Sequence, residues 1–379
     1  MNPGYTPTPA QREDCARQLT AAATRVRALT AFVGLDGFVD EILHVVDKRR
    51  SAEEYVRLAR MGQWGERISA AAGRSTNIEL VGLMTKLGGN GPIMANALAS
   101  LGLRVTCLGL LGYPHLHPVF DEFSRRAKVH SIAEPGYTDA VEFEDGKVMV
   151  GKHQSLKQMT WENIKTRFGK REFAGHFGRA DLVGFVNWTM LPYMSDVWEA
   201  LLEELCPKLR GPRRILFFDL ADPEKRLKKD LARALRLVVQ FGRHFDVILG
   251  LNEKEAHEVA KALDIDAPAP TPEALSRLGA AIHRRVPVQT LVIHPVSYAL
   301  ALGAGGVAIT SGPTTKKPLI TTGAGDHFNS GFCLGRLLGL NSRDSLLCGV
   351  TCSGFYVRTA KSPGVNDLAR MLKDKTVKY

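Results

Sequence analysis

The chain has 379 residues, of which 45% are hydrophobic and 23% are charged, a composition typical of one large globular domain with a sizeable buried core. The first 30 residues carry charges throughout and lack the apolar run of a signal peptide. Because no window approaches the roughly 20 apolar residues of a membrane span, we expect a soluble, cytoplasmic protein with no membrane partner.

Six cysteines occur without a C-x-x-C pair, which argues against a disulfide framework and against a zinc site. The net charge of +11 raises the question of a nucleic-acid partner. The basic residues do not form one block: in 224–239, Leu227, Leu231 and Leu235 repeat at helical spacing and Lys and Arg fill positions between them. This pattern is typical of a solvated helix face, so we expect no nucleic-acid partner and interpret the charge as favouring solubility and anionic substrates.

Residues 1–30 are predicted to form a peripheral helical segment, and from residue 31 onward short apolar runs alternate with helical patterns. The runs that indicate buried strands are 31–35, 79–83, 105–112, 182–187, 215–220, 247–251 and 290–294. The helical patterns lie at about 92–101, 116–128, 194–207, 223–241, 253–263, 326–340 and 343–360. Alternation of this kind predicts an α/β fold, a doubly wound and mostly parallel sheet flanked by helices, with its ligand at the carboxyl ends of the strands.

Two regions, 38–48 and 137–153, alternate apolar and polar residues instead, and the second contains the turn "EDGK". We expect them to form a small antiparallel β lid that stands off the main domain. Residues 50–78, approximately, lie between the first of these regions and the apolar run 79–83, and they are predicted to form a helical insertion. On this interpretation 31–379 is one α/β domain that carries the lid.

The stretch "TTGAGDHFNSGF" (321–332) places Gly323, Ala324 and Gly325 directly before Asp326, where an amphipathic helix begins. Free N–H groups and the positive end of the helix dipole make such a turn a binding site for phosphate. A carboxylate at the same place is also an ordinary helix N-cap. This stretch alone leaves both interpretations open.

A second glycine motif, "KLGGNGPIMANALASLG" (86–102), combines Gly88 and Gly89 with a helix start, and "GLNEKEAHEV" (250–259) follows a predicted strand. Together with "GAGDHFNSGF", in this order, these segments resemble the signatures of the ribokinase-like (PfkB) carbohydrate kinases: GG…N.A..LA.LG, N-x-x-E and GAGD.F..GF. The resemblance runs from about residue 31 to the C-terminus.

The resemblance implies a kinase that moves the terminal phosphoryl group of ATP to a hydroxyl of a sugar, sugar phosphate or nucleoside, with Mg²⁺. Asp326 would be the general base, and the backbone N–H groups of Gly323, Ala324 and Gly325 would hold the charge of the transferring group. Asn252 and Glu255 would orient Mg²⁺ and the phosphates, Glu255 through water. The structural alternative for these two is a solvated first helical turn.

The acceptor side is expected to use charged and amide groups because carboxylates accept the protons of polyol hydroxyls. The residues concerned are Asp36, Asp40, Gly88, Gly89, Asn90 and Asn187, with Asp219 as a further candidate at the end of a strand. Lys152, at the end of the second lid strand, is predicted to neutralise the transferring phosphoryl group once the lid closes and excludes water. The lid is also a possible contact surface for a homodimer.

The sequence departs from the family pattern at two places: "PLITT" precedes GAGD without the usual acidic residue, and Ile93 occupies the position of an asparagine, with Asn96 one turn later. "GGNGPIMANAL" and "VIHPVSYALAL" are similar to segments of the ADP-dependent sugar kinases. GAGDHFNSGF favours ATP, and ADP remains an alternative donor. A non-catalytic sugar- or nucleotide-binding protein on the same fold is the other alternative, although such a protein would tolerate loss of Asp326.

Overall fold

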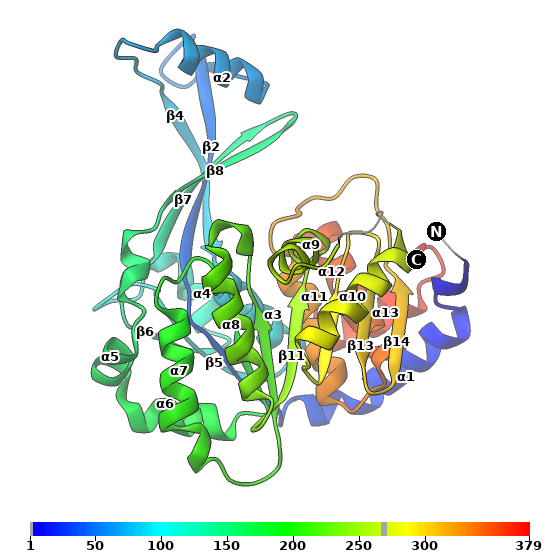
Figure 1. Ribbon diagram of the computed structural model, residues 1–379. Helices are drawn as coiled ribbons and strands as arrows, with labels where there is room; N and C mark the ends of the chain where they lie inside the picture. The colour runs from blue at the N-terminus through cyan, green and yellow to red at the C-terminus, as the bar shows by residue number, and fades with distance from the viewer. Residues whose placement is uncertain (1–2, 267–270) are drawn as a thin grey trace.

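The computed structural model describes residues 3–266 and 271–379, and its largest element is a nine-stranded sheet with helices on both faces (Figure 1). The strand order is β14-β13-β12-β11-β10-β9-β1-β5-β6. The strands are β1 Thr30–Gly34, β5 Arg104–Gly109, β6 Lys128–Ser131, β9 Leu182–Phe185, β10 Ile215–Asp219, β11 Asp246–Leu251, β12 Thr290–Ile293, β13 Tyr298–Gly303 and β14 Gly306–Ser311. Neighbours from β6 to β12 are parallel and the last two pairs are antiparallel, which confirms the expected mostly parallel α/β sheet.

The inner strands of this sheet, such as β1, β9 and β11, are buried on both faces, which is why they read as continuous apolar runs in the sequence. In β1, Phe32 lies in one hydrophobic cluster and Val33 in the other. The first cluster includes side chains of α6 Lys170–Arg179, α7 Met194–Glu204, α8 Lys228–Phe241, α9 Glu253–Ala262 and α10 Pro272–Arg285. The second includes side chains of α1 Pro9–Val26, α3 Asn90–Leu101, α11 Ala324–Leu337, α12 Ser342–Thr359 and α13 Val365–Lys373.

The N-terminal segment is helical, as expected, and α1 places Cys15, Ala16 and Leu19 in the second cluster. The shorter helical pieces connect strands. They are η1 Pro3–Tyr5, η2 Pro118–Phe120, α4 Asp121–Ser124, η3 Gln154–Gln158, α5 Trp161–Asn163, η4 Ile164–Gly169, η5 Cys206–Lys208 and η6 Pro223–Lys225. None of the helices in the described part of the chain combines the length and the hydropathy that crossing a bilayer requires.

A second sheet stands off the main domain as a lid and is capped by α2 Met61–Ala70 (Figure 1). Its strands are β2 Phe38–Arg49, β3 Tyr55–Arg57, β4 Leu80–Gly88, β7 Gly136–Phe143 and β8 Gly146–Lys152. The expected purely antiparallel lid is wrong in one pairing, because β2 and β7 are parallel. Both strands leave the carboxyl edge of the main sheet, one after β1 and the other after β6, and therefore run outward in the same direction.

Two further element predictions are wrong. The run 79–83 belongs to the largely exposed lid strand β4 and not to the main sheet, because an apolar run does not reveal which strand it pairs with. The helix predicted at 116–128 is two short turns, η2 and α4, followed by the edge strand β6. Pro118 begins the first of these turns, and its fixed φ and missing N–H suit a turn start better than a helix interior.

Candidate active site

Asp36 lies two residues beyond β1 and joins three segments at the carboxyl edge of the sheet. Its carboxylate accepts hydrogen bonds from the backbone N–H groups of Asn90 (2.9 Å) and Gly91 (2.7 Å) and from Asn187 Nδ2 (2.7 Å). Burial raises the pKa of Asp36 to about 6, and these donors partly offset that effect. With its oxygens occupied in this way, Asp36 fixes the start of α3 and the position of Asn187.

Asn90 in turn connects the two glycine motifs, because its Nδ2 donates a hydrogen bond to Asp326 Oδ1 at 3.0 Å. Asp326 lies in the first turn of α11 and its side chain is only 5% exposed. Burial raises the pKa of Asp326 well above its ordinary value, and the nearby carboxylates of Asp219, Asp36 and Glu255 raise it further. The two motifs, 236 positions apart in the chain, thus meet at one buried carboxyl group.

The N-cap alternative for Asp326 does not describe this helix start. The N-cap of α11 is Gly323, at φ 91°, and no side chain caps it. A backbone in that left-handed region favours glycine strongly. The Asp326 carboxyl group is instead directed toward the acceptor-side motif, where it meets Asn90.

The loop before α11 is fixed by two aromatic side chains that hold its carbonyl groups. Tyr356 donates its hydroxyl to Thr322 O (3.0 Å), and His327 Nδ1 lies 2.7 Å from Gly323 O. The two rings stack at 3.6 Å between centroids. Gly323, Ala324 and Gly325 carry the N–H groups that are predicted to hold the transferring group. Among these, the N–H of Ala324 donates to Thr321 O at 3.1 Å. Gly325 follows it in the first turn, where a helix leaves N–H groups without intrahelical acceptors.

A second group of carboxylates lies where β10 and β11 end. Asp219 accepts from the N–H of Ala221 and from Asn329 Nδ2, both at 2.9 Å. Glu255 accepts from the N–H groups of Asn252 (2.8 Å) and Asp222 (3.0 Å). Asn252 Oδ1 accepts the N–H of Glu255 at 2.9 Å, so the N-x-x-E segment forms a capping box. The alternative of a solvated first turn is wrong for Glu255, which is only 5% exposed.

The carboxyl groups of Asp219 and Glu255 can supply the negative charge that a cation site requires. Burial raises the pKa of Asp219 to about 6 and that of Glu255 to about 8, where the charge of Asp219 contributes. In the described ranges no lysine, arginine or histidine forms an ion pair with Asp219, Glu255 or Asp326. The Oδ1 atom of Asn329, beside Asp219, is buried and has no hydrogen-bond partner. Oxygen donors that lack a counter-charge fit Mg²⁺ and its bound waters.

The lid carries Asp40, and the charges of Lys86 and Lys147 act on its carboxyl group. Asp40 pairs with Lys86 of β4 and with Thr138 of β7 in the strand register. Burial raises the pKa of Asp40, and the charge of Lys86 lowers it in part. A Cβ atom at Gly88 would lie 2.5 Å from the Asp40 carboxyl group. Only glycine therefore fits at position 88 beside this carboxylate.

Lys152 lies on the face of the lid sheet opposite to that of Asp40, where its ammonium group pairs with Asp139 at 2.8 Å. Lys147, on the opposite face of β8, makes a hydrogen bond to Thr322 Oγ1 in the loop before α11. Side chains alternate across a strand, so two positions whose numbers differ by an odd amount, here five, lie on opposite faces. That alternation was visible in the sequence, but which face turned inward was not.

His294 is a residue that sequence reasoning missed. It follows β12, and its ring lies 4.7 Å from that of Phe328 between centroids. Its Cε1 atom lies 3.3 Å from the position that a Cβ atom at Gly325 would occupy. Burial lowers the pKa of His294 to about 4, and its Nε2 atom is buried without a partner. Its position at a strand's carboxyl end was the available signal.

The same arrangement of elements occurs in solved sugar kinase structures. Ribokinase of Arabidopsis thaliana, solved with ribose and ATP, aligns with a TM-score of 0.61 at 15% identity, over 92% of this chain and 99% of that one. Phosphofructokinase-2 of Escherichia coli, solved with substrates and products, aligns with a TM-score of 0.60 at 12% identity, over 91% and 98%. The chain therefore has a ribokinase-like fold.

Sequence comparison gives the family within that class. The model of the prokaryotic ketohexokinase family matches residues 6–375. The ketohexokinase of Haloferax volcanii is 30% identical over 346 residues, which are 91% of each chain. This chain belongs to the prokaryotic ketohexokinase family and is a carbohydrate kinase of the PfkB type.

Proposed function

We propose that this kinase transfers the terminal phosphoryl group of ATP to a hydroxyl of a ketohexose, with Asp326 as general base. The observation that supports the proposal is the hydrogen bond from Asn90 to Asp326, which joins the acceptor-side motif to the glycine-rich helix start. The relative from Haloferax volcanii is a ketohexokinase, which supports a ketohexose as acceptor. Fold relatives solved with ATP or ADP support nucleotide use.

Each group has a defined task in this proposal. The raised pKa of Asp326 makes its carboxylate a better acceptor for the proton of an attacking hydroxyl. Asp40 and Asn187 face the acceptor, while Asp36 holds Asn90 and Asn187 in place. The first-turn N–H of Gly325 stabilises negative charge on the transferring group. Neutral His294 packs beside that turn without bringing a competing charge.

Mg²⁺ fits the carboxylates of Asp219 and Glu255, and when bound it would neutralise phosphate charge at this edge. Asn329 Oδ1 is the neutral oxygen beside them and would accept a hydrogen bond from a metal-bound water. Asn252 holds Glu255 through the capping box. We therefore assign these four residues to the metal side of the site.

Metal affinity should depend on pH, because a divalent cation competes with protons for these carboxylates. With pKa values raised to about 6 for Asp219 and about 8 for Glu255, Mn²⁺ should bind more tightly as the pH rises between these values. Electron paramagnetic resonance of free Mn²⁺ measures this. Glu255→Gln should remove the upper part of the dependence, and the exposed control Glu203→Gln should keep it. An affinity that does not vary with pH would contradict the assignment.

Phosphoryl transfer itself is tested by a coupled assay with D-fructose, D-ribose and fructose 6-phosphate, each with ATP and with ADP as donor. We expect turnover with fructose and ATP. Turnover with ADP alone would establish the alternative donor, and binding of fructose without turnover under any donor would establish the non-catalytic alternative. The assay therefore separates all three interpretations in one set of measurements.

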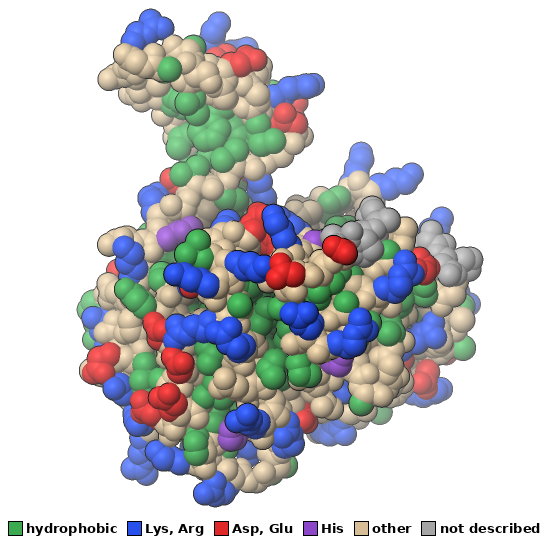
Figure 2. Space-filling view, viewed as in Figure 1, with side chains coloured by type: hydrophobic (Ala, Val, Ile, Leu, Met, Phe, Trp, Pro, Cys, Tyr) green, Lys and Arg blue, Asp and Glu red, His purple; other side chains and the backbone are tan. Residues whose placement is uncertain are grey.

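The lid supports a further part of the proposal, a homodimer. Met84, Ile42, Ala140 and Met149 form one row across β4, β2, β7 and β8. The two methionines are 57% and 47% exposed, and Figure 2 shows hydrophobic side chains gathered on the lid below its helical cap. An exposed apolar patch of this kind is typical of a contact surface.

In sedimentation velocity we expect the wild type to be a dimer and Met84→Glu/Met149→Glu to be a monomer. The control is Val307→Glu in β14, an apolar residue of similar exposure (49%) outside the lid. It should remain dimeric. A monomeric wild type, or a dimer that survives both lid substitutions, would rule out this surface.

A further inference from the structure

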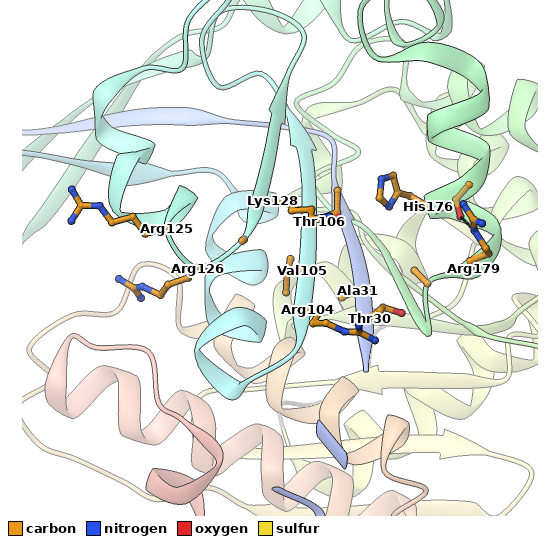
Figure 3. Close-up of a pocket in the computed structure, with 13 residues that line it drawn as sticks. Thr30, Ala31, Arg104, Val105, Thr106, Arg125, Arg126, Lys128, His176 and Arg179 are labelled. Atoms are coloured by element: carbon orange, nitrogen blue, oxygen red, sulfur yellow. Dashed lines mark hydrogen bonds between the residues drawn. The ribbon is translucent and has the colours of Figure 1, made fainter. Parts of the chain in front are cut away.

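A hollow of about 480 Å³ lies at the amino ends of β1, β5 and β6, at the edge of the main sheet opposite Asp326 (Figure 3). Its floor consists of the buried residues Ala31, Val105, Thr106 and Ala180. His176, near the end of α6, forms one wall, and its ring stacks against Phe32 at 5.5 Å between centroids. We call this feature the basic hollow.

Five cationic side chains surround the basic hollow, and no Asp or Glu lines it. The cations are Arg104, Arg125, Arg126, Lys128 and Arg179. In Figure 3, Arg104 approaches from below Thr30 and Ala31, Arg179 lies on the opposite side beside His176, and Arg125 and Arg126 extend outward from the turn before β6. The charges thus come from separate elements around one concavity, with Arg125 and Arg126 directed outward from it.

The carboxylates near the hollow are already engaged. Glu122 pairs with Arg126, which is the only one of the five cations that has an ion pair within the described ranges. Glu172 lies 3.1 Å from His176 Nε2, and Asp181 accepts the N–H and the hydroxyl of Thr30. Four cations therefore remain without an acidic partner.

Some cations on other surfaces of the described chain form ion pairs. Arg213 lies 2.9 Å from Asp246, Arg233 2.7 Å from Asp196, and Lys228 2.6 Å from Asp264. Like charges gathered at one concave place repel each other, and the repulsion is relieved when an anion enters. The basic hollow is therefore electrostatically incomplete in a way that the paired surfaces are not.

We propose that the basic hollow binds a small anion carrying two or more phosphate groups, at a site separate from the active site. Arg104 and Arg179 supply guanidinium groups, which bind phosphate oxygens in a bidentate manner, and Lys128 supplies a point charge. The hydroxyl of Thr106 lies on the floor. The volume is within the range of small-molecule pockets. A single-stranded nucleic acid would need an extended groove with stacking aromatics, whereas these cations surround one hollow. The proposal does not depend on the proposed function.

Isothermal titration with sodium tripolyphosphate tests the proposal on the full-length chain at low ionic strength. The wild type is compared with Arg104→Gln/Arg179→Gln and, separately, with Lys128→Glu, an exposed position at the start of an edge strand. The matched control, Lys229→Gln/Lys373→Gln, removes two exposed cations far from the hollow. Melting temperature verifies that each variant is folded.

We expect the double hollow variant and Lys128→Glu each to bind tripolyphosphate at least tenfold more weakly than the wild type, with the control unchanged within twofold. Any binding in the active site persists in all variants and is subtracted as a common component. The proposal is overturned if both hollow variants bind like the wild type, or if the control loses as much affinity as they do, since the effect would then reflect net charge alone.

Discussion

Asp326→Asn is expected to lower kcat by about 10³-fold while leaving the Michaelis constant for the sugar within a few-fold, because general-base catalysis contributes on this scale. The amide keeps the shape of the side chain and can still meet Asn90, but it cannot take the acceptor proton. The coupled assay with fructose and ATP measures both constants. In the wild type, activity should fall as the pH falls through the raised pKa of Asp326, since only the carboxylate is the base.

The stability of this variant separates a catalytic role from a structural one. A carboxyl group whose pKa is raised in the folded state binds its proton more tightly there than in the unfolded chain, so its ionised form lowers stability at alkaline pH. The neutral amide removes that cost. Asp326→Asn should therefore melt at the same or a higher temperature than the wild type at pH 8. Asp264→Asn, on the surface, should keep full turnover. An active Asp326→Asn enzyme would refute the mechanism.

Lys147→Ala should lower kcat by about 10²-fold, the scale of losing one group that stabilises transition-state charge. Its ammonium group contacts Thr322, in the loop that we propose receives the transferring phosphoryl group. Lys152→Ala is the matched control, because it removes a lysine from the same strand whose partner is Asp139 on the other face. It should change kcat less than twofold.

The outcome for this pair has a direct consequence for how the lid works. If Lys152→Ala were the slower enzyme, the lid would have to rearrange so that its opposite face met the phosphates. If the two variants were equal, neither lysine would neutralise the transferring group. Rapid-quench measurement of a single turnover distinguishes a slow chemical step from slow product release in either case.

The main sheet could be predicted because its strands are buried on both faces, and such strands give unbroken apolar runs that need no partner to be recognised. The lid could be predicted only in part. The alternation in β2 and β7 was visible, but β4 carries an apolar run similar to those of the core, and its pairing with β2 depends on contacts that are distant in the sequence. Strands β13 and β14 were missed beside the helix-rich C-terminal region.

In the candidate site, the short motifs pointed to the glycines and helix starts, because these positions are restricted in which residues they accept. Gly88 and Gly323 are fixed by close approach and by backbone conformation, which leave a clear trace in the sequence. The role of Asn90 as the link to Asp326, and the inward direction of Lys147, depend on how two distant segments pack. A single sequence does not show how distant segments pack, so the link from Asn90 to Asp326 and the direction of Lys147 could be seen only in the three-dimensional structure.

The root of the lid has one further consequence. A Cβ at Gly37 would lie 2.2 Å from Leu110 O, and Gly37 O accepts the N–H of Gly136, so both long lid strands emerge from a tightly packed junction. Any rotation about this junction displaces a group in proportion to its distance along the strand. Asp40 is near the pivot and moves little, whereas Lys147 near the hairpin tip sweeps the longest arc. With Asp40 as the proposed sugar ligand, this geometry lets the sugar bind before the tip of the lid moves and predicts an ordered mechanism with the sugar bound first.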